Sequence, residues 1–272
     1  MDKIKILFCT NAFRKITNGP AKFANLLLKE SKTISGLEIR ILTEDVESTY
    51  VDIYKLDLYI PKILKPFSQF IRMYKYHSAA MRIRRTYNFD ALVYNNAIVG
   101  LLSVLLFENT FGFINDYTLA TSVSDRKGTE YEKRLKIFTF KIVEKFYCKC
   151  AKKPVIVNSG FLANTLSKEY KSPVDKFRIL YPGVDNFLIR NFSRSLINNK
   201  IPKSILFVKT NFHLAGFWIL ADAIIKLQIP VNLTVVGPPK RFHENIKTFF
   251  LNSNVSLSLH SYLSPDEVYR LM

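Results

Sequence analysis

The sequence has few cysteines and no clustered metal ligands. Three cysteines, Cys9, Cys148 and Cys150, stand among 272 residues, and so small and odd a set excludes a disulfide framework. The pair Cys148-x-Cys150 lacks the two-residue spacing of zinc and redox pairs, and the four histidines are scattered. We therefore expect a reducing cytosol as the compartment, and neither a metal nor another cofactor.

Long hydrophobic runs are also missing. The longest, Ile98–Phe107, contains a serine and falls well short of the ~20 residues that a helix needs to span a bilayer. The N-terminal segment MDKIKILFCTNAF has the pattern of a short strand and lacks the apolar core of a signal peptide. No Walker loop, Ser-His-Asp set or Cys-His set is present. We expect a soluble or peripheral protein.

Acidic residues are outnumbered by basic ones. The sequence contains 40 Lys and Arg against 22 Asp and Glu, a formal net charge of +18. This excess favours an anionic partner, which means a phospholipid surface, nucleotide phosphates or nucleic acid. The alternative is a lysine-rich proteome in which these charges are simply solvated. No nucleic-acid recognition motif is present, so we expect no specific nucleic-acid binding.

Apolar runs alternate with helical patterns along most of the chain. A continuous apolar strand over Ile4–Cys9 precedes a helix from Ala21, and a second strand follows at Leu37–Thr43. Residues 46–90 are less regular, apart from a basic, aromatic helix over Ser68–Tyr87. The alternation predicts an α/β fold built on parallel sheets, with a right-handed βαβ unit at its start.

The length and the 48% hydrophobic content indicate two domains with real cores. We expect the first over residues 1–185, a polar linker over 186–203 and the second from 204 to 272. Ser264-Pro265-Asp266-Glu267 predicts a helix start, with Ser as N-cap and Glu three residues later. Because the chain ends soon after this signal, we expect the second domain to be incomplete.

A long amphipathic helix is predicted over Glu130–Lys153. Its apolar residues at near-helical spacing are Leu135, Phe138, Ile142 and Phe146. If this stripe is core, Phe140 and Tyr147 lie outside it, and Phe140 is more exposed than Phe138. The interleaved lysines leave two interpretations open. The helix docks on an anionic membrane, or its aromatic residues are buried and its lysines face water.

Several motifs together resemble the family 4 glycosyltransferases, which have the GT-B fold of two Rossmann-like domains. They are the first strand with the loop-helix NGPAKFANLLL, then VNSGF, YPGVD, and the pair FVKTNFHLAG and TVVGPP. The landmarks run from Lys5 to Tyr269 but match only part of a typical family member. The resemblance implies retaining transfer of a hexose from a nucleotide diphosphate sugar, which binds mainly to the C-terminal domain.

The resemblance also implies site residues in the first domain. Gly19, in Asn18-Gly19-Pro20, stands where the family has a Gly-rich loop, and a helix N-terminus there favours phosphate. Asn115 and Asp116 stand at the family's His-Asp position, which implies a catalytic role. Asn can hydrogen-bond a sugar hydroxyl but cannot act as a base. A plain strand-to-helix turn and a capping aspartate are the alternatives.

In the second domain, Thr210 stands at the family's Arg position and Ala215 at its Lys position, while Gly216 matches. Lys209, displaced by one residue, is a mobile point charge suited to replace the missing cation. The implied donor-binding residues are Lys209, Thr210, Asn211, Gly216, Gly237, Pro238 and Tyr262. The alternatives are a surface lysine at a strand end and ordinary loop turns.

The sequence therefore predicts a bacterial, cytoplasmic hexosyltransferase acting on a cell-surface glycan or lipid-linked acceptor, and peripheral attachment to the inner face of the membrane stays open. The family's Glu-x7-Glu segment would lie beyond Met272, so we expect the 272-residue chain to be inactive alone. The alternative is a degenerate glycosyltransferase-like binding module without catalysis, favoured by the departures at Asn115, Thr210 and Ala215.

Overall fold

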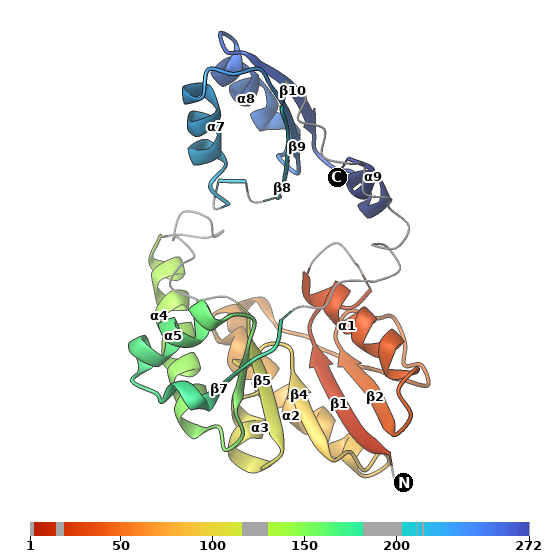
Figure 1. Ribbon diagram of the computed structural model, residues 1–272. Coiled ribbons are helices and arrows are strands. Elements are labelled where there is room, and N and C mark those ends of the chain that lie inside the picture. The colour runs from red at the N-terminus through yellow and green to blue at the C-terminus, as the bar shows by residue number, and fades with distance from the viewer. Residues whose placement is uncertain are drawn as a thin grey trace. The chain divides into compact units, whose positions relative to one another are not determined.

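The computed structural model describes residues 3–14, 19–115, 130–181, 203–210, 212–213 and 215–271. Internal contacts divide the chain into two compact units, Met1–Val184 and Asp185–Met272 (Figure 1). Residues 182–202, which include most of the predicted YPGVD turn and linker, lie outside the described residues, as do Asp116 and Asn211.

The first unit contains a seven-stranded sheet in which all paired strands are parallel. In spatial order the strands are β3 (Ile53–Lys55), β2 (Leu37–Thr43), β1 (Ile4–Thr10), β4 (Ala91–Tyr94), β5 (Thr110–Ile114), β6 (Val155–Val157) and β7 (Phe177–Ile179). The predicted α/β fold class is confirmed, because parallel strands joined by helices are what the alternating pattern requires.

The helices of this unit connect successive strands. They are α1 (Gly19–Ser31), α2 (Ser68–Arg84), α3 (Leu101–Leu106), α4 (Glu130–Cys150) and α5 (Gly160–Tyr170), with 3-10 turns η1 (Lys62–Phe67) and η4 (Val174–Lys176). Ser159 begins α5 as its N-cap, since its side chain accepts a hydrogen bond from the Leu162 amide at 3.2 Å.

Successive residues of β1 face different helices. Leu7 and Cys9 belong to a buried cluster with Tyr76 of α2, whereas Phe8 packs with Ala24 of α1. Because side chains alternate along a strand, α1 and α2 lie on opposite faces of the sheet (Figure 1). Both faces are covered, which explains why β1 is apolar almost throughout.

The strand order reverses at β1, because the chain first builds the sheet on one side of β1 and then on the other. The chain leaves β1 through α1 toward β2 and β3, then returns to β4 on the other side and continues outward to β7. Right-handed crossovers then place α1 on one face and α3, α4 and α5 on the other. The carboxyl ends of β1 and β4 form the switch point at which open α/β sheets bind ligands.

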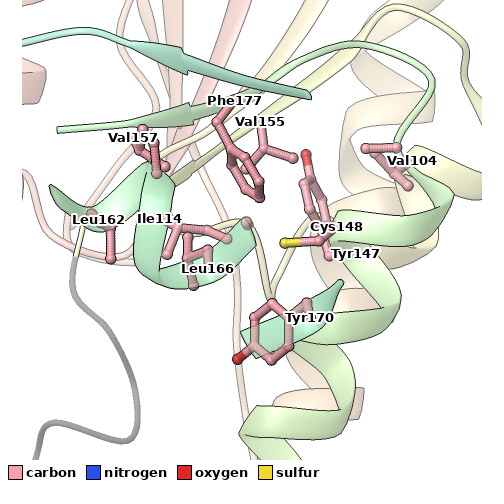
Figure 2. Close-up of a cluster of buried hydrophobic side chains, with 13 residues drawn as sticks. Val104, Ile114, Tyr147, Cys148, Val155, Val157, Leu162, Leu166, Tyr170 and Phe177 are labelled. Atoms are coloured by element: carbon pink, nitrogen blue, oxygen red, sulfur yellow. The ribbon is translucent and has the colours of Figure 1, made fainter. Parts of the chain in front are cut away.

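Figure 2 shows the core beneath α4 and α5. Ile114 of β5 and Val157 of β6 pack against Tyr147 of α4 and against Leu166 and Tyr170 of α5. Cys148 lies in this core and Cys9 in the cluster with Tyr76 of α2, and burial raises the pKa of the Cys148 thiol to about 12 and that of the Cys9 thiol further. Burial therefore disfavours the reactive thiolate at both cysteines.

The predicted orientation of α4 is wrong. Phe138, Ile142 and Phe146 are 61%, 42% and 58% exposed, whereas Tyr147 is fully buried and Phe140 packs partly buried against a core cluster. The helix buries its other side, because it must contact both the sheet and the neighbouring helices α2 and α3. The spacing identified an apolar stripe, but the side facing the core also carries smaller and polar residues.

The second unit contains a three-stranded parallel sheet with helices packed on it. Its elements are β8 (Lys203–Val208), α7 (Phe217–Lys226), β9 (Val231–Val236), η5 (Lys240–Phe242), α8 (His243–Phe250), β10 (Val255–His260) and α9 (Pro265–Arg270). Leu233 and Val235 of β9 share one core with Ile224 of α7 and Ile246 of α8.

The predicted helix start at Ser264 is confirmed. The Ser264 hydroxyl accepts a hydrogen bond from the Glu267 amide at 3.3 Å, and the Glu267 carboxylate accepts one from the Ser264 amide at 2.7 Å. This reciprocal pair is a capping box, with Pro265 at the first helical position.

A stability test follows from Gly112 of β5. A Cβ there would lie 2.7 Å from the Tyr147 ring carbon Cζ and 2.9 Å from the Ala97 Cα. We expect Gly112→Ala to lower the free energy of unfolding by about 1–3 kcal/mol, because overpacking forces the core to shift. Urea unfolding measures this loss.

The control is Gly160→Ala, whose Cβ would meet its nearest neighbour at 3.6 Å and which we expect to be neutral or slightly stabilising. Adding Tyr147→Phe to Gly112→Ala should restore part of the loss, since it removes a buried hydroxyl that has no hydrogen-bond partner among the described residues. Equal stability of the two alanine variants would contradict this packing.

Candidate functional site

A polar residue follows or ends each central strand of the first sheet. Thr10 ends β1, and Asn95, Asn115 and Asn158 directly follow β4, β5 and β6. Because the strands are parallel, these residues meet at one edge of the sheet, around the switch point. Sequence reasoning singled out only Asn115 among them, although a polar residue straight after an apolar run was a usable signal for the others.

Asn95, directly after β4, links the end of β1 to the start of α1 at the switch point. Its side chain is buried, and its amide nitrogen Nδ2 donates to the Thr10 hydroxyl at 3.1 Å and to the Pro20 carbonyl at 3.3 Å. The Thr10 carbonyl also accepts a hydrogen bond from the buried Tyr76 hydroxyl at 2.9 Å. These bonds fix the start of α1 against β1 and β4.

Asn115 continues this network. Its Nδ2 donates to the Asn95 carbonyl at 3.3 Å, and its own carbonyl accepts from Nδ2 of Asn158 at 2.6 Å. Gly19 lies at the same edge, as the first residue of α1, next to the Pro20 that Asn95 contacts. The structure thus brings Gly19 and Asn115 to one sheet edge, where the side chains of Asn95, Asn115 and Asn158 offer amide donors and acceptors.

In the second unit, the loops after β8 and β9 touch. The Lys209 amide donates to the Val236 carbonyl at 2.9 Å, and the Gly237 amide donates to the His260 carbonyl at 2.8 Å. Gly237 has φ +118°, and a Cβ there would lie 2.5 Å from the Lys209 carbonyl carbon and 2.8 Å from the Thr210 nitrogen. Only glycine allows the two backbones to approach this closely.

His243 connects the loops after β9 and β10, and sequence reasoning missed it. Its ring nitrogen Nε2 lies 3.0 Å from the Pro238 carbonyl oxygen and 3.2 Å from the Ser261 hydroxyl. A carbonyl can only accept, so Nε2 carries the proton that it donates to Pro238. Tyr262, adjacent to Ser261, is 71% exposed. His243 belongs to no sequence motif, so the sequence did not predict this contact.

The start of α7 faces the same edge. Gly216 caps the helix with φ +78°, a left-handed conformation that favours glycine, and Phe217 begins it. The free amides of a helix N-terminus favour an anion, and Lys209 is exposed in the loop that precedes it. Two further exposed cations, Lys240 and Arg241, follow Pro239 in η5.

The contacts therefore join Lys209, Thr210, Gly237 and Pro238 in one loop cluster, with Tyr262 beside it and Gly216 at the start of α7. Within the described residues, no group of three or more potential metal ligands occurs. In that same part of the chain, no helix is both long and apolar enough to cross a bilayer.

A hollow of about 540 Å³ lies at the opposite edge of the first sheet. It is lined by the end of α1 and the start of β2, over Ser31–Ile39, together with Lys3 and Asp52. Parallel α/β sheets bind ligands at the carboxyl ends of their strands, whereas this hollow lies at the amino ends. We therefore assign the candidate site to the carboxyl edges.

Three solved structures share the fold of this chain at 15% sequence identity. A glycosyltransferase from Rickettsia africae matches with a TM-score of 0.61, covering 99% of this chain and 71% of that one. WaaG, a glycosyltransferase involved in lipopolysaccharide biosynthesis, matches with a TM-score of 0.63, covering 97% of this chain and 72% of that one. Sucrose-phosphate synthase of Thermosynechococcus elongatus matches with a TM-score of 0.62, covering 95% of this chain and 71% of that one.

No family model and no curated protein matches the sequence. The structural likeness confirms the predicted glycosyltransferase-like fold of GT-B type, with two Rossmann-like sheets. At this identity the likeness concerns the fold alone, because one fold hosts many functions.

The switch-point network can be tested with Asn95→Asp, which keeps the side-chain shape and removes both donated hydrogen bonds. At pH 7 a buried carboxylate would face the Pro20 carbonyl oxygen, so we expect the free energy of unfolding to fall by about 2–3 kcal/mol. Burial would raise the folded pKa of this carboxyl above about 3.9, so the loss grows as pH rises through and above that value.

Asn109→Asp is the matched control, because Asn109 is exposed and donates to the Asp90 carbonyl at 3.2 Å. We expect it to change stability by less than about 0.5 kcal/mol. Urea unfolding of both variants at pH 4 and pH 7 compares them, and an equal, pH-independent loss would contradict the role given to Asn95.

Proposed function

We propose that the protein transfers a hexose from a nucleotide diphosphate sugar to a cell-surface glycan or lipid-linked acceptor, with retention of configuration. The donor binds at the carboxyl edge of the second sheet and the acceptor at that of the first. The observation that carries this proposal is the fold shared with glycosyltransferases over nearly the whole chain, together with polar loops at both carboxyl edges.

The donor diphosphate contacts Lys209 and the first turn of α7 in this proposal. Lys209 supplies the positive charge that the family obtains from Arg and Lys, while Thr210 and Asn211 offer hydrogen-bond donors. The close backbone approach at Gly237 holds the loop after β9 against Lys209 and Thr210, so the nucleotide meets both loops at one place in this proposal. The exposed ring of Tyr262 offers a surface on which the base stacks.

The acceptor sugar lies against Asn115 and Asp116 in the first unit. The Asn115 amide hydrogen-bonds a hydroxyl and orients it, because its position is fixed through Asn95 and Asn158. An amide cannot remove a proton, so Asn115 acts by positioning, and Gly19 keeps the start of α1 open to an anionic group. Orientation and electrostatic stabilisation supply the rate enhancement in this proposal.

The name of WaaG links this fold to lipopolysaccharide biosynthesis, which supports a cell-surface glycan as the product. We accordingly place the protein in a bacterial cytoplasm, at the inner face of the membrane. The alternative remains a glycosyltransferase-like binding module, favoured by Thr210 and Ala215 where the family has its cations. The exposed cations Lys240 and Arg241 offset part of that loss of charge.

Titration calorimetry with UDP, ADP and UDP-glucose tests the donor site. Lys209→Ala should weaken binding about tenfold or more, since a hydrogen bond to a charged group contributes about 1.5–3 kcal/mol. Lys226→Ala is the matched control, because Lys226 is an exposed lysine at the other end of α7, paired with Asp222 at 2.7 Å. Equal affinities of the two variants would contradict the donor site.

Measuring turnover of a nucleotide sugar distinguishes an active glycosyltransferase from a binding module without catalysis. We expect residues 1–272 alone to bind a donor without consuming it, and release of hexose from labelled UDP-glucose would contradict this. A Glu-x7-Glu segment after Met272 in the gene, with transfer by that longer chain and a product of retained configuration, would support the enzyme. A stop codon at that point would support the binding module.

A further inference from the structure

The exposed side of α4 carries an apolar stripe that nothing in the described part of the chain covers. Phe138, Ile142 and Phe146 are spaced four residues apart, so they follow one another along the helix within an arc of about 80°. We call these three residues the outer stripe. Large apolar side chains in a contiguous exposed row mark an interaction surface more often than a chance exposure.

Packing on the opposite side prevents α4 from turning to bury this stripe. Tyr147 and Cys148 are buried against the sheet and α5, while Val143 is buried in the cluster formed with Met73 of α2, which Phe140 also contacts. A rotation that covered Phe138 and Phe146 would expose these residues instead. The outer stripe is therefore a fixed feature of the fold.

Exposed cations lie beside the outer stripe. Lys145 and Lys149 are exposed beside it, and so is Arg134 one turn before Phe138. The single carboxylate within residues 134–150, that of Glu144, is buried and accepts a hydrogen bond from the Tyr170 hydroxyl at 2.5 Å. Lys141, on the edge of the stripe, is paired with Glu169. Among the side chains described over residues 134–150, the exposed side of the helix thus presents apolar groups and cations, with the Glu169 carboxylate of α5 paired to Lys141 at its edge.

The neighbouring helices continue this character. α2 contains no acidic residue, and its Phe70 and Tyr74 are exposed, while Lys75 and Arg82 provide exposed cations. On α3, between α2 and α4 in sequence and in contact with both, Leu105 and Leu106 are exposed. The helix layer therefore combines apolar and cationic groups beyond α4 alone.

We propose that the outer stripe docks this protein on a bilayer surface containing anionic phospholipid. The helix α4 lies in the plane of the interface, with Phe138, Ile142 and Phe146 at the boundary of headgroups and acyl chains and with Lys145 and Lys149 at lipid phosphates. The charge pattern selects this occupant, because the exposed cations Lys145 and Lys149 beside an apolar row complement anionic headgroups. The narrow apolar arc suits shallow insertion.

Docking deepens the proposed function, since a lipid-linked acceptor is held at such a surface, but binding to the bilayer does not depend on sugar transfer. UDP-glucose binding and vesicle binding can be measured on the same samples. Loss of one with retention of the other therefore shows which of the two proposals fails.

Co-sedimentation with vesicles of phosphatidylglycerol and phosphatidylcholine, against phosphatidylcholine alone, tests the docking. We expect binding to the anionic vesicles only, weakened by salt. The double variant Phe138→Gln with Phe146→Gln should lower the partition coefficient about tenfold or more, as should Lys145→Gln with Lys149→Gln. Matched controls in the second unit are Leu227→Gln with Leu251→Gln, and Lys226→Gln with Lys247→Gln, which should bind to vesicles like the parent.

The variant Phe138→Trp reports how deeply residue 138 inserts into the bilayer. If the stripe only stabilised the fold, the fluorescence of this tryptophan would not change when vesicles are added. The other tryptophan, Trp218, lies in the second unit, so a blue-shifted emission that brominated lipid quenches is expected only from the new residue. Equal binding to neutral vesicles, or unchanged binding of both α4 variants, would overturn the proposal. So would self-association in solution that Phe138→Gln with Phe146→Gln abolishes while no vesicle binding occurs, because the stripe would then join two copies of the chain.

Discussion

The parallel arrangement of strands is the constraint on which the rest of this structure depends. Each strand of both sheets ends at the same edge as its neighbours, so the residue that follows one strand lies beside the residue that follows the next. Thr10, Asn95 and Asn115 meet for this reason, although the chain separates them widely. The ladder between β8 and β9 brings Lys209 to Gly237 in the same way.

Helix α4 serves two different environments. One side is fixed by the sheet and by α2, α3 and α5, with Tyr147 and Val143 fully or nearly buried. The other side keeps the outer stripe and its lysines in solvent, and packing on the inner side prevents their burial. A helix that is apolar on two sides cannot satisfy both within one layer, and the uncovered side is then available for a second surface.

The sequence predicts the elements with buried strands and strong local signals. The apolar run at Leu37–Thr43 is a strand with the same bounds, and the capping signal at Ser264 begins α9. The short edge strand β3 was not predicted, because Ile53–Lys55 has only three residues and one of them is charged. Three residues are too few for the alternation of apolar and polar side chains to indicate a strand.

The orientation of α4 and the contacts of Asn95 and His243 could not be predicted because they depend on tertiary partners. Helical spacing identifies a stripe, but which side faces the core depends on neighbours such as Met73 of α2, far away in the sequence. Likewise, His243 gains its partners Pro238 and Ser261 only when β9 and β10 pair. Such contacts are properties of the sheet rather than of a local segment.

Hydrogen exchange of the chain with and without UDP-glucose tests most directly whether a donor binds at the carboxyl edge of the second sheet. We expect slower exchange at the amides of residues 209–210, 215–219, 237 and 261–262, where the loops after β8, β9 and β10 and the start of α7 lie. Slower exchange confined to Ser31–Ile39, which lines the hollow at the amino edge of the first sheet, would contradict the account.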